Sequence, residues 1–355
     1  MQKLTYAEAI RTTLIQEMER DKNVFCYGIG CDDFKGIFGT TIGLQEKFGK
    51  NRVFDTPLSE DSLTGFGIGA AMNGMRPVQI HIRADFALLA MNQIINMMSG
   101  IQYMSNNQLL CPIVIRIIIG RGWGQGFQHS KSLFSLFTHV PGLIVIAPSN
   151  PIDMKGMLTK AIRSNSPVIC FEHRWLYWQE QEVHPCVLES DFEQPFQTVV
   201  HPYRSDGEAD ITLLSYSWGV VECKKAADVL WSKCSVKTNI IDLKRLSNLD
   251  IDLIVSCINT DECIIVEDDW LSNSVGAGFL AKYLDGKFNL THNPINFSRI
   301  GWKNTPCPTA RHLENDFYYD AKDIVLKVTN RLGLRVPDLR DVDCYSHENK
   351  FKGPF

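Results

Sequence analysis

The sequence predicts an α/β protein made of two three-layer αβα domains with mainly parallel sheets. Short, continuously apolar runs alternate with longer segments of helical periodicity, first over residues 5–172 and again over residues 210–302. A run that is apolar throughout is typical of a parallel strand whose sheet is covered by helices on both faces. A polar, proline-bearing stretch between the two alternations predicts a linker between two domains.

The first alternation predicts a domain over residues 1–185. The expected strands cover residues 23–28, 76–83, 111–119, 142–148 and 166–172. The expected helices cover residues 5–21, 62–75, 86–104 and 150–165. Strands and helices that take turns in this way favour one sheet between two helical layers.

The second alternation predicts a smaller domain over residues 208–332, after a linker at 186–207. Its expected strands are 210–216, 235–243, 262–269 and 294–302, and its expected helices are 220–233 and 274–284. Residues 333–355 show no apolar period, so we expect an extended tail along the surface or on a neighbouring chain.

Composition excludes several classes of protein. The 355 residues are 45% hydrophobic and 21% charged, which excludes a disordered chain, a collagen and a coiled coil. There are 36 Lys and Arg against 40 Asp and Glu, without a basic stripe, so we expect no nucleic-acid or membrane partner. No apolar run approaches the roughly 20 residues of a membrane-spanning helix.

The eleven cysteines are odd in number, lack a C-x-x-C pair and mostly lie in apolar runs. This usage is typical of reduced, buried thiols rather than of disulfides or a zinc site. The first ten residues have no signal-peptide or transit-peptide pattern. We therefore expect a cytoplasmic location.

The helix expected over residues 62–75 carries Gly65, Gly67, Gly69 and Gly74. Each interior glycine costs about 1 kcal/mol relative to alanine, so a close approach must compensate. We expect that approach at a subunit or domain interface. Neither a G-x-G-x-x-G dinucleotide loop nor a P-loop occurs in the chain.

Five residues are candidates for a catalytic or binding role, and the sequence alone leaves a structural role open for each of them. Glu60 begins the glycine-rich helix, where a solvated acid is also favoured by the helix dipole. Phe86 is either a core ring or a ligand contact, and His129 is either a solvated loop residue or a proton carrier. His81 and Arg83 lie two apart on one strand, which predicts the same side, either in a substrate pocket or as a salt-bridged interface pair.

Several motifs together carry a resemblance to a known family. They are DTPLSE at 55–60, NQIIN, YMS, GWGQGFQHS, HVPGLIVIAPSNPIDMKGML, IDLKRLSNLD, VEDDW and SVGAG. From about Leu4 to Val328 the chain resembles the β subunit of the thiamine-diphosphate-dependent 2-oxoacid dehydrogenases. The resemblance implies a transketolase-like pyrimidine-binding domain followed by a transketolase C-terminal-like domain.

The resemblance also implies roles. Glu60, which ends DTPLSE, would hydrogen-bond N1′ of the cofactor's aminopyrimidine and promote loss of the proton from its thiazolium C2. Phe86 would pack on the aminopyrimidine, and His129 would lie near the substrate and the acyl acceptor. His81 and Arg83 have no basic counterparts in the familiar dehydrogenases, which indicates a changed substrate pocket.

Three departures from the family pattern matter. Ile29 stands where the family commonly has an acid. Ser164 and Ser166 stand where the family's potassium-binding loop has Asp and Asn, so whether this chain binds a potassium ion is left open. No GDG motif occurs, so an α partner is expected to hold the magnesium and the diphosphate. We expect an α2β2 tetramer in which β packs on β through the helix at 62–75.

The sequence leaves three alternative functions open, two of them enzymatic and one non-catalytic. The first is decarboxylation of a 2-oxoacid with acyl transfer to a lipoyl acceptor, with a lipoyl acyltransferase as a further partner. The second is a carboligase that adds the acyl unit to a small metabolite or sugar carbonyl. The third is a non-catalytic scaffold, against which the joint presence of Glu60, Phe86 and His129 argues.

Overall fold

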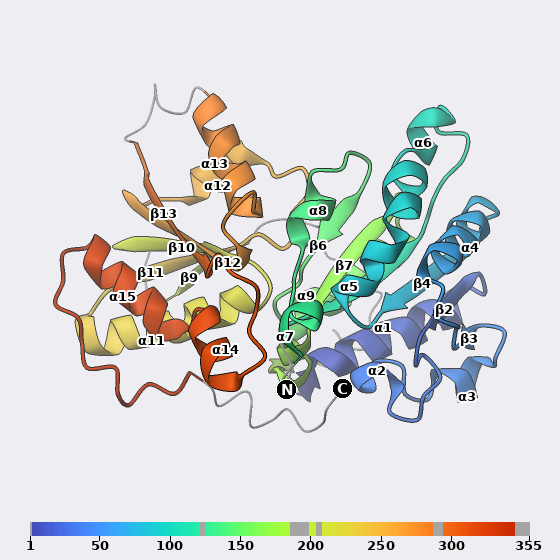
Figure 1. The fold of residues 1–355 in the computed structure, drawn as a ribbon, viewed down its shortest axis with the longest axis horizontal. Coiled ribbons are helices and arrows are strands. Elements are labelled where there is room, and N and C mark those ends of the chain that lie inside the picture. The colour runs from blue at the N-terminus through green and yellow to red at the C-terminus, as the bar shows by residue number, and fades with distance from the viewer. Residues whose placement is uncertain (1, 121–124, 185–198, 204–207, 287–293, 345–355) are drawn as a thin grey trace. The chain divides into compact units, whose positions relative to one another are not determined.

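The computed structural model describes residues 2–120, 125–184, 199–203, 208–286 and 294–344. It confirms an α/β fold in which mostly parallel sheets are packed with helices (Figure 1). The described chain divides into two compact units near residue 196. The exact domain limits remain a prediction, because most of the expected linker lies outside the described residues.

The first unit is built on a six-stranded parallel sheet with the strand order β3-β2-β4-β5-β7-β6. Its strands are β2 (Val24–Gly28), β3 (Val53–Phe54), β4 (Arg76–His81), β5 (Val114–Ile119), β6 (Ile144–Ile146) and β7 (Val168–His173). The longer helices are α1 (Tyr6–Arg20), α4 (Glu60–Met72) and α9 (Pro151–Arg163). All five strands expected from continuous apolar runs are present.

Short elements complete this unit. They are α2 (Gly36–Gly39), α3 (Leu44–Phe48), α5 (Ala84–Ala87), η1 (Leu88–Ala90), η2 (Asn92–Met98), α6 (Ile101–Met104), α8 (Phe134–Thr138) and η3 (Arg174–Trp178). The short helix α7 (Gly126–His129) is divided, because its first two residues group with the second unit. A separate antiparallel pair joins β1 (Gln2–Thr5) to β8 (Glu180–Val183). Sequence periodicity did not indicate this pair, because four residues are too few to show a pattern.

The helix expected over residues 86–104 is interrupted. The segment forms α5, the 3₁₀ turn η1, the π-helix η2 and then α6, with Ser99 N donating to Ile94 O at 3.1 Å across five residues. Apolar spacing does not distinguish α from π hydrogen bonding, because both place similar residues on one face. Breaks of this kind often occur at functional sites.

Helix starts follow the sequence closely. Thr5 caps α1 in a capping box with Glu8, and Asn150 caps α9 ahead of Pro151. In α4 a close approach within the chain explains Gly67, because a Cβ there would collide with the hydroxyl of Tyr27 on strand β2. Gly69 and Gly74 have no neighbouring atom within 4 Å of a Cβ among the described residues, so the interface expected for this helix stays a prediction.

The strand order of the first sheet reverses between β2 and β4. From β2 the chain moves outward to β3, returns through α4 to the opposite side of β2 as β4, and then continues to β5. Ligands of open α/β sheets bind beyond the carboxyl ends of the strands at such a reversal. The topology thus marks the ends of β2 and β4 as the place to look for a site.

The second unit has a five-stranded sheet with the order β13-β12-β10-β11-β9, in which β9 alone is antiparallel. Its strands are β9 (Val199–Tyr203), β10 (Ile211–Ser215), β11 (Thr238–Asp242), β12 (Glu262–Trp270) and β13 (Asn296–Trp302). Its helices are α11 (Trp218–Cys234), α12 (Ile251–Cys257), α13 (Val275–Asp285), α14 (Arg311–Phe317) and α15 (Ala321–Arg331). Strand β9 falls in the range that was expected to be linker.

The described part of the tail, residues 333–344, contains no helix or strand and lies on the second unit. Lys233 of α11 donates to Asp338 O at 2.7 Å and pairs with Asp341 Oδ1 at 2.6 Å. Cys344 is buried against the core of that unit. No helix in the described part of the chain is long and apolar enough to cross a bilayer.

Candidate functional site

A partly open pocket lies in the first unit where β2 and β4 end. The end of β2, the loop before α4, the first turn of α4, the end of β4 and the short helix α5 line it. Its residues are Tyr27, Gly28, Ile29, Thr56, Pro57, Glu60, Leu63, Gln79, Ile80, His81, Ile82 and Phe86. This is the strand-order reversal at which the topology places a ligand.

Gly28 brings the two strand ends together. It ends β2 with φ +148, and a Cβ built on it would collide with the carbonyl oxygen of Ile80 on β4. Both the backbone angle and the space therefore require glycine at this position. Next to it, Ile29 presents an apolar side to the pocket where the resemblance led us to look for an acid.

Glu60 is the first residue of α4, and only 8% of it is exposed. Its Oε1 is buried without a hydrogen-bond partner among the described residues. An unpaired buried oxygen of a carboxyl group is costly, at roughly 1–3 kcal/mol or more. Such an atom inside a pocket indicates that a ligand supplies the missing donor.

Two further buried polar atoms without a protein partner come from β4 and line the same pocket. They are Oε1 of Gln79 and Nε2 of His81. Burial lowers the pKa of His81 to about 4, so its imidazole is neutral at physiological pH. Sequence reasoning missed Gln79, although the same alternation that singled out His81 places Gln79 on the same side of the strand.

The shared side expected for His81 and Arg83 stays a prediction, although β4 itself ends at His81. Arg83 does not line the pocket. Its guanidinium lies 5.9 Å from the centre of the Phe38 ring, which Arg174 also approaches to 5.1 Å. Burial, and then the charge of Arg83, lower the pKa of Arg174 to about 9.

His129 lies beside the pocket. Its ring centroid is 5.7 Å from that of the half-buried Phe86, at an interplanar angle of 48°. Its Nδ1 is 3.6 Å from Oδ2 of Asp85, and Oδ1 of Asp85 pairs with Lys131 at 2.6 Å. Asp85 was not predicted as a site residue, although it directly precedes Phe86.

The described residues contain no group of three or more His, Cys, Asp or Glu that could hold a metal ion. The pocket joins the unpaired carboxyl oxygen of Glu60, the polar side chains of Gln79 and His81, and the aromatic rings of Tyr27 and Phe86. This combination suits a flat, nitrogen-bearing ring that stacks on Phe86 and donates to Glu60.

Family models match both units. Residues 2–179 match the pyrimidine-binding domain of transketolase, and residues 203–324 match the transketolase C-terminal domain. A split-gene transketolase, described as an inactive β4 tetramer, has the same fold with a TM-score of 0.73 and 18% identity over 93% of this chain and 99% of that chain. Fold and domains therefore define a protein of the transketolase-like class.

Two relatives with known names identify the family within this class. The β subunit of 2-oxoisovalerate dehydrogenase from Bacillus subtilis is 37% identical over 276 residues, 78% of this chain and 82% of that protein. The mitochondrial β subunit of the pyruvate dehydrogenase E1 component from Homo sapiens is 32% identical over 333 residues, 93% of this chain and 91% of that protein. The chain belongs to the E1 β subunits of the 2-oxoacid dehydrogenases, whose thiamine-diphosphate-dependent reaction is decarboxylation with acyl transfer.

The pocket fits the cofactor of that family. The unpaired Oε1 of Glu60 can accept from a protonated ring nitrogen, and the ring of Phe86 offers an apolar face to an aminopyrimidine. The roles of individual residues are argued below.

Proposed function

We propose that this chain is the subunit that binds the aminopyrimidine of thiamine diphosphate and, with an α partner, decarboxylates a 2-oxoacid and transfers the acyl group to a lipoyl acceptor. One observation carries the proposal. The carboxyl group of Glu60 is buried in the pocket, and one of its oxygens lacks a protein donor among the described residues. Thiamine diphosphate, when bound, supplies the thiazolium carbon that adds to the carbonyl of the 2-oxoacid.

Glu60 holds a proton at N1′ of the aminopyrimidine. Its place at the start of α4 keeps the carboxyl group inside the pocket. Phe86 packs against the ring and fixes its plane. Together these residues orient the cofactor and move one proton, as general acid–base catalysis requires.

His129 acts on the substrate side of the site. Asp85 Oδ2 lies 3.6 Å from its Nδ1, so the carboxylate orients the imidazole ring. A protonated imidazole stabilises negative charge on the bound 2-oxoacid and donates a proton during acyl transfer. Lys131 holds Asp85 in turn, which makes Asp85 a positioning residue.

Gln79 and His81 are proposed as the residues that adapt this pocket to its ligand. Both place a buried polar atom without a protein partner at its wall, and His81 stays neutral there. A neutral imidazole either donates or accepts one hydrogen bond at Nε2, without adding charge. Arg83 is proposed to act elsewhere, as part of the buried cationic pair with Arg174 around Phe38.

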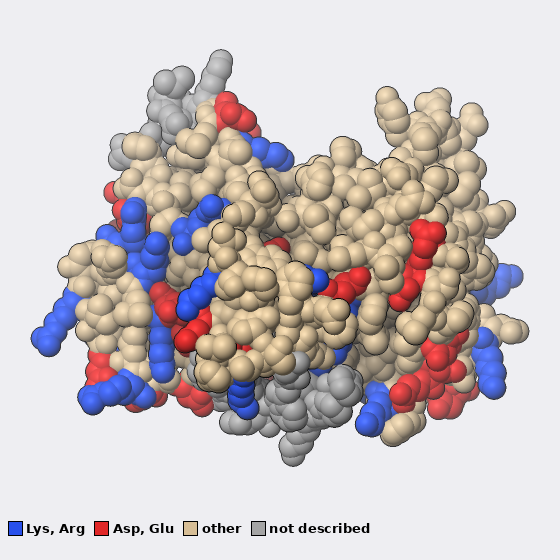
Figure 2. Space-filling model, in the orientation of Figure 1, with Lys and Arg blue, Asp and Glu red and all other residues tan. Residues whose placement is uncertain are grey.

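An α partner is proposed to hold the magnesium and the diphosphate, because the chain lacks the GDG motif. A surface for self-association is also proposed on the first unit. Exposed apolar side chains gather on α4, η1, η2 and α6, and the face in Figure 2 carries few charges over α6. They are Phe66, Met72, Leu88, Leu89, Met97, Tyr103 and Met104. Patches of this kind mark protein interfaces.

A cytoplasmic location is proposed from the cysteines. The ten cysteines in the described residues are all free thiols, and eight of them are buried. Free thiols in such number are typical of a reducing compartment.

The decisive experiment uses the chain co-expressed with its α partner. In Glu60→Gln, size and hydrogen bonding are nearly kept while the acidic proton is lost, so 2-oxoacid decarboxylation should fall by about 10²- to 10⁴-fold. Asp61→Asn is the matched control, because Asp61 is the next residue of the same helix turn but does not line the pocket. A loss below threefold in Glu60→Gln would remove this residue from the reaction.

A second experiment separates His129 from cofactor activation. In His129→Ala, hydrogen–deuterium exchange at the cofactor's C2 should stay near that of the wild type. Turnover with both an artificial electron acceptor and a lipoyl domain should fall. Loss of exchange together with turnover would contradict the role given to His129.

A further inference from the structure

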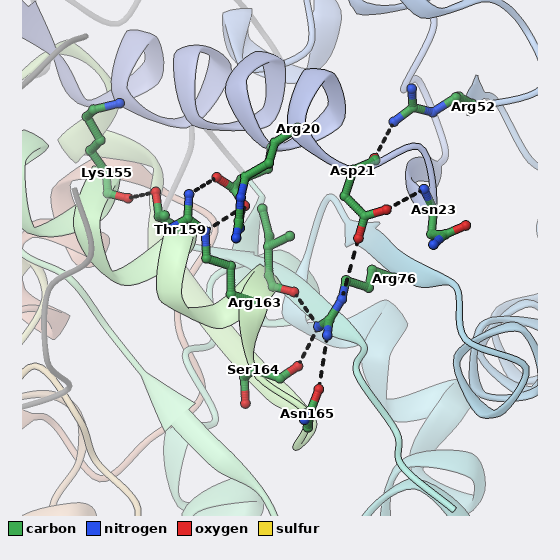
Figure 3. Close-up of polar contacts among 12 residues, drawn as sticks. Arg20, Asp21, Asn23, Arg52, Arg76, Lys155, Thr159, Arg163, Ser164 and Asn165 are labelled. Carbon is green, nitrogen blue, oxygen red and sulfur yellow. Dashed lines mark hydrogen bonds and ion pairs between the residues drawn. The ribbon is translucent and has the colours of Figure 1, made fainter. Parts of the chain in front are cut away.

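Arg76, the first residue of β4, directs its guanidinium at the turn between α9 and β7 (Figure 3). Nη1 donates to the carbonyl oxygens of Ile162 and Ser164, each at 2.9 Å. Nη2 donates to Oδ1 of Asn165 at 2.9 Å. On its other side, Nε lies 3.7 Å from Oδ2 of Asp21, the residue that ends α1.

The guanidinium lies at the carboxyl end of α9, where helix carbonyls lack partners and a partial negative charge accumulates. Ser164 N donates to the carbonyls of Lys160 at 2.9 Å and Ala161 at 3.2 Å. Arg76 supplies the donor for the next carbonyl, that of Ile162. Arg76 is thus a charged C-terminal cap provided by a strand distant in sequence.

The carbonyls of the turn itself also have donors. Oγ of Ser164 donates to the carbonyl of Ser166 at 3.1 Å, and Nε2 of Gln102 donates to that of Asn165 at 3.1 Å. Ser164 and Ser166 are the positions at which the resemblance pointed to a potassium loop with Asp and Asn. The hydroxyl of Ser164 therefore takes part in satisfying this turn from within.

These observations do not fit a potassium ion. A cation bound by this turn would have to share carbonyl oxygens that already accept an N–H or O–H donor. It would also lie close to a fixed guanidinium charge, without the carboxylate that an Asp in the turn would supply. Like charges at such distances repel unless an anion offsets them.

The surroundings add to this repulsion. A cavity with about 580 Å³ of empty space beside Arg76 is lined by three arginines and only two acids, Glu17 and Asp21. Arg163 binds Glu17 through two hydrogen bonds of 2.9 and 2.7 Å, which ties α9 to α1. Arg20 lies 3.4 Å from the same carboxylate.

We propose that Arg76 is the resident cation of the α9–β7 turn, and that this chain orders the turn without binding potassium. The proposal concerns a structural position distant from the pocket chemistry. It stands or falls independently of the catalytic roles given to Glu60 and His129.

The first test needs no variant. Thermal unfolding of the full chain is measured in potassium, sodium and choline chloride at equal ionic strength. The three midpoints should agree within about 1 °C, since a ligand that does not bind the folded state does not stabilise it. A rise of several degrees in potassium alone would overturn the proposal.

The second test removes the guanidinium. Arg76→Gln loses the charge and leaves the Ile162 and Ser164 carbonyls short of donors, so the unfolding midpoint should fall by about 5 °C. Arg76→Lys keeps the positive charge but loses the planar, forked guanidinium, so its unfolding midpoint should fall by less than that of Arg76→Gln. It also serves as the readout if Arg76→Gln does not fold.

Arg20→Gln is the matched control, because Arg20 lines the same cavity but its side chain is 51% exposed and does not bind the turn. Its midpoint should change by less than about 1 °C. Equal midpoints for the wild type, Arg76→Gln and Arg76→Lys would show that Arg76 does not hold the turn. They would contradict the proposal.

Discussion

Two buried polar clusters lie in the six-stranded sheet, and they differ in whether the protein completes them. At the ends of β2 and β4, Glu60, Gln79 and His81 each leave one buried atom without a partner among the described residues. On β5 and β7, Arg116 and Glu172 are fully buried but bind each other. Buried polar groups that lack protein partners indicate a ligand, whereas paired ones indicate structure.

In the cluster of Arg116 and Glu172, nearly every polar side-chain atom has a hydrogen-bond partner. Arg116 donates through Nε and Nη2 to the two oxygens of Glu172 at 2.5 and 2.8 Å, and Nη2 also donates to Thr40 at 3.0 Å. Tyr177 donates to Glu172 at 2.8 Å, which leaves only Nη1 of Arg116 without an acceptor. Burial lowers the pKa of Arg116, but the charge of Glu172, its hydrogen bonds and the nearby Tyr177 and Cys170 together outweigh burial, so the net shift is upward.

The largest expected effect follows from removing the negative charge of Glu172 from its ion pair with Arg116. In Glu172→Gln the charge of Arg116 stays buried without its counterion, which costs about 3–5 kcal/mol of unfolding free energy. The unfolding midpoint should fall by roughly 10 °C, measured by calorimetry. Tyr177→Phe removes one hydrogen bond and should cost only about 1 kcal/mol. Equal losses in the two variants would contradict the ion-pair account.

The next effect concerns the pH dependence of stability. His81 has a folded-state pKa of about 4, below the value near 6.5 of an unfolded histidine. As the pH falls below 6.5 the unfolded state takes up the proton first, so the stability present at neutral pH is lost towards pH 4. The loss attributable to His81 is about 3 kcal/mol.

His81→Phe removes this titration, so its unfolding free energy should fall less than that of the wild type between pH 6.5 and 4.5. Denaturant unfolding at several pH values measures the difference. His312→Gln, at an exposed position, should follow the wild type. A slope of His81→Phe identical to that of the wild type would show that His81 is not buried in its neutral form.

The smallest effect sharpens the comparison. Glu60→Gln removes a carboxyl group that has an unpaired oxygen, so the unfolding midpoint without ligand should change by less than about 2 °C. With the α partner and thiamine diphosphate at 100 times its Kd, the wild type gains about 2.7 kcal/mol. The variant should gain clearly less. A large drop without ligand would place Glu60 in the structural class of Glu172.

Much of the fold could be predicted from the sequence because continuously apolar runs such as residues 114–119 become strands buried on both faces. Local signals also predicted Glu60 at the start of a helix. The motif resemblance supplied the family, which the relatives confirm. These features depend on residues that are close together along the chain.

Features that depend on distant residues could not be predicted in this way. Arg83 and Arg174 both approach the ring of Phe38, and no pattern within the strand brings these three residues together. Arg76 reaches a turn almost 90 residues further along the chain, at Ser164 and Asn165. Such contacts follow from the order of strands in the sheet, which periodicity does not specify.

The backbone contact at Gly28 constrains how this site can change during evolution. Because any side chain there would strike the carbonyl of Ile80, the β2 wall is closed to substitution at that point. Strand β4 lines the pocket with the side chains of Gln79 and His81, where a substitution changes the lining without meeting a backbone atom of β2. New ligand preferences should therefore arise by mutation along one strand, while the opposite strand stays the same among descendants of this gene.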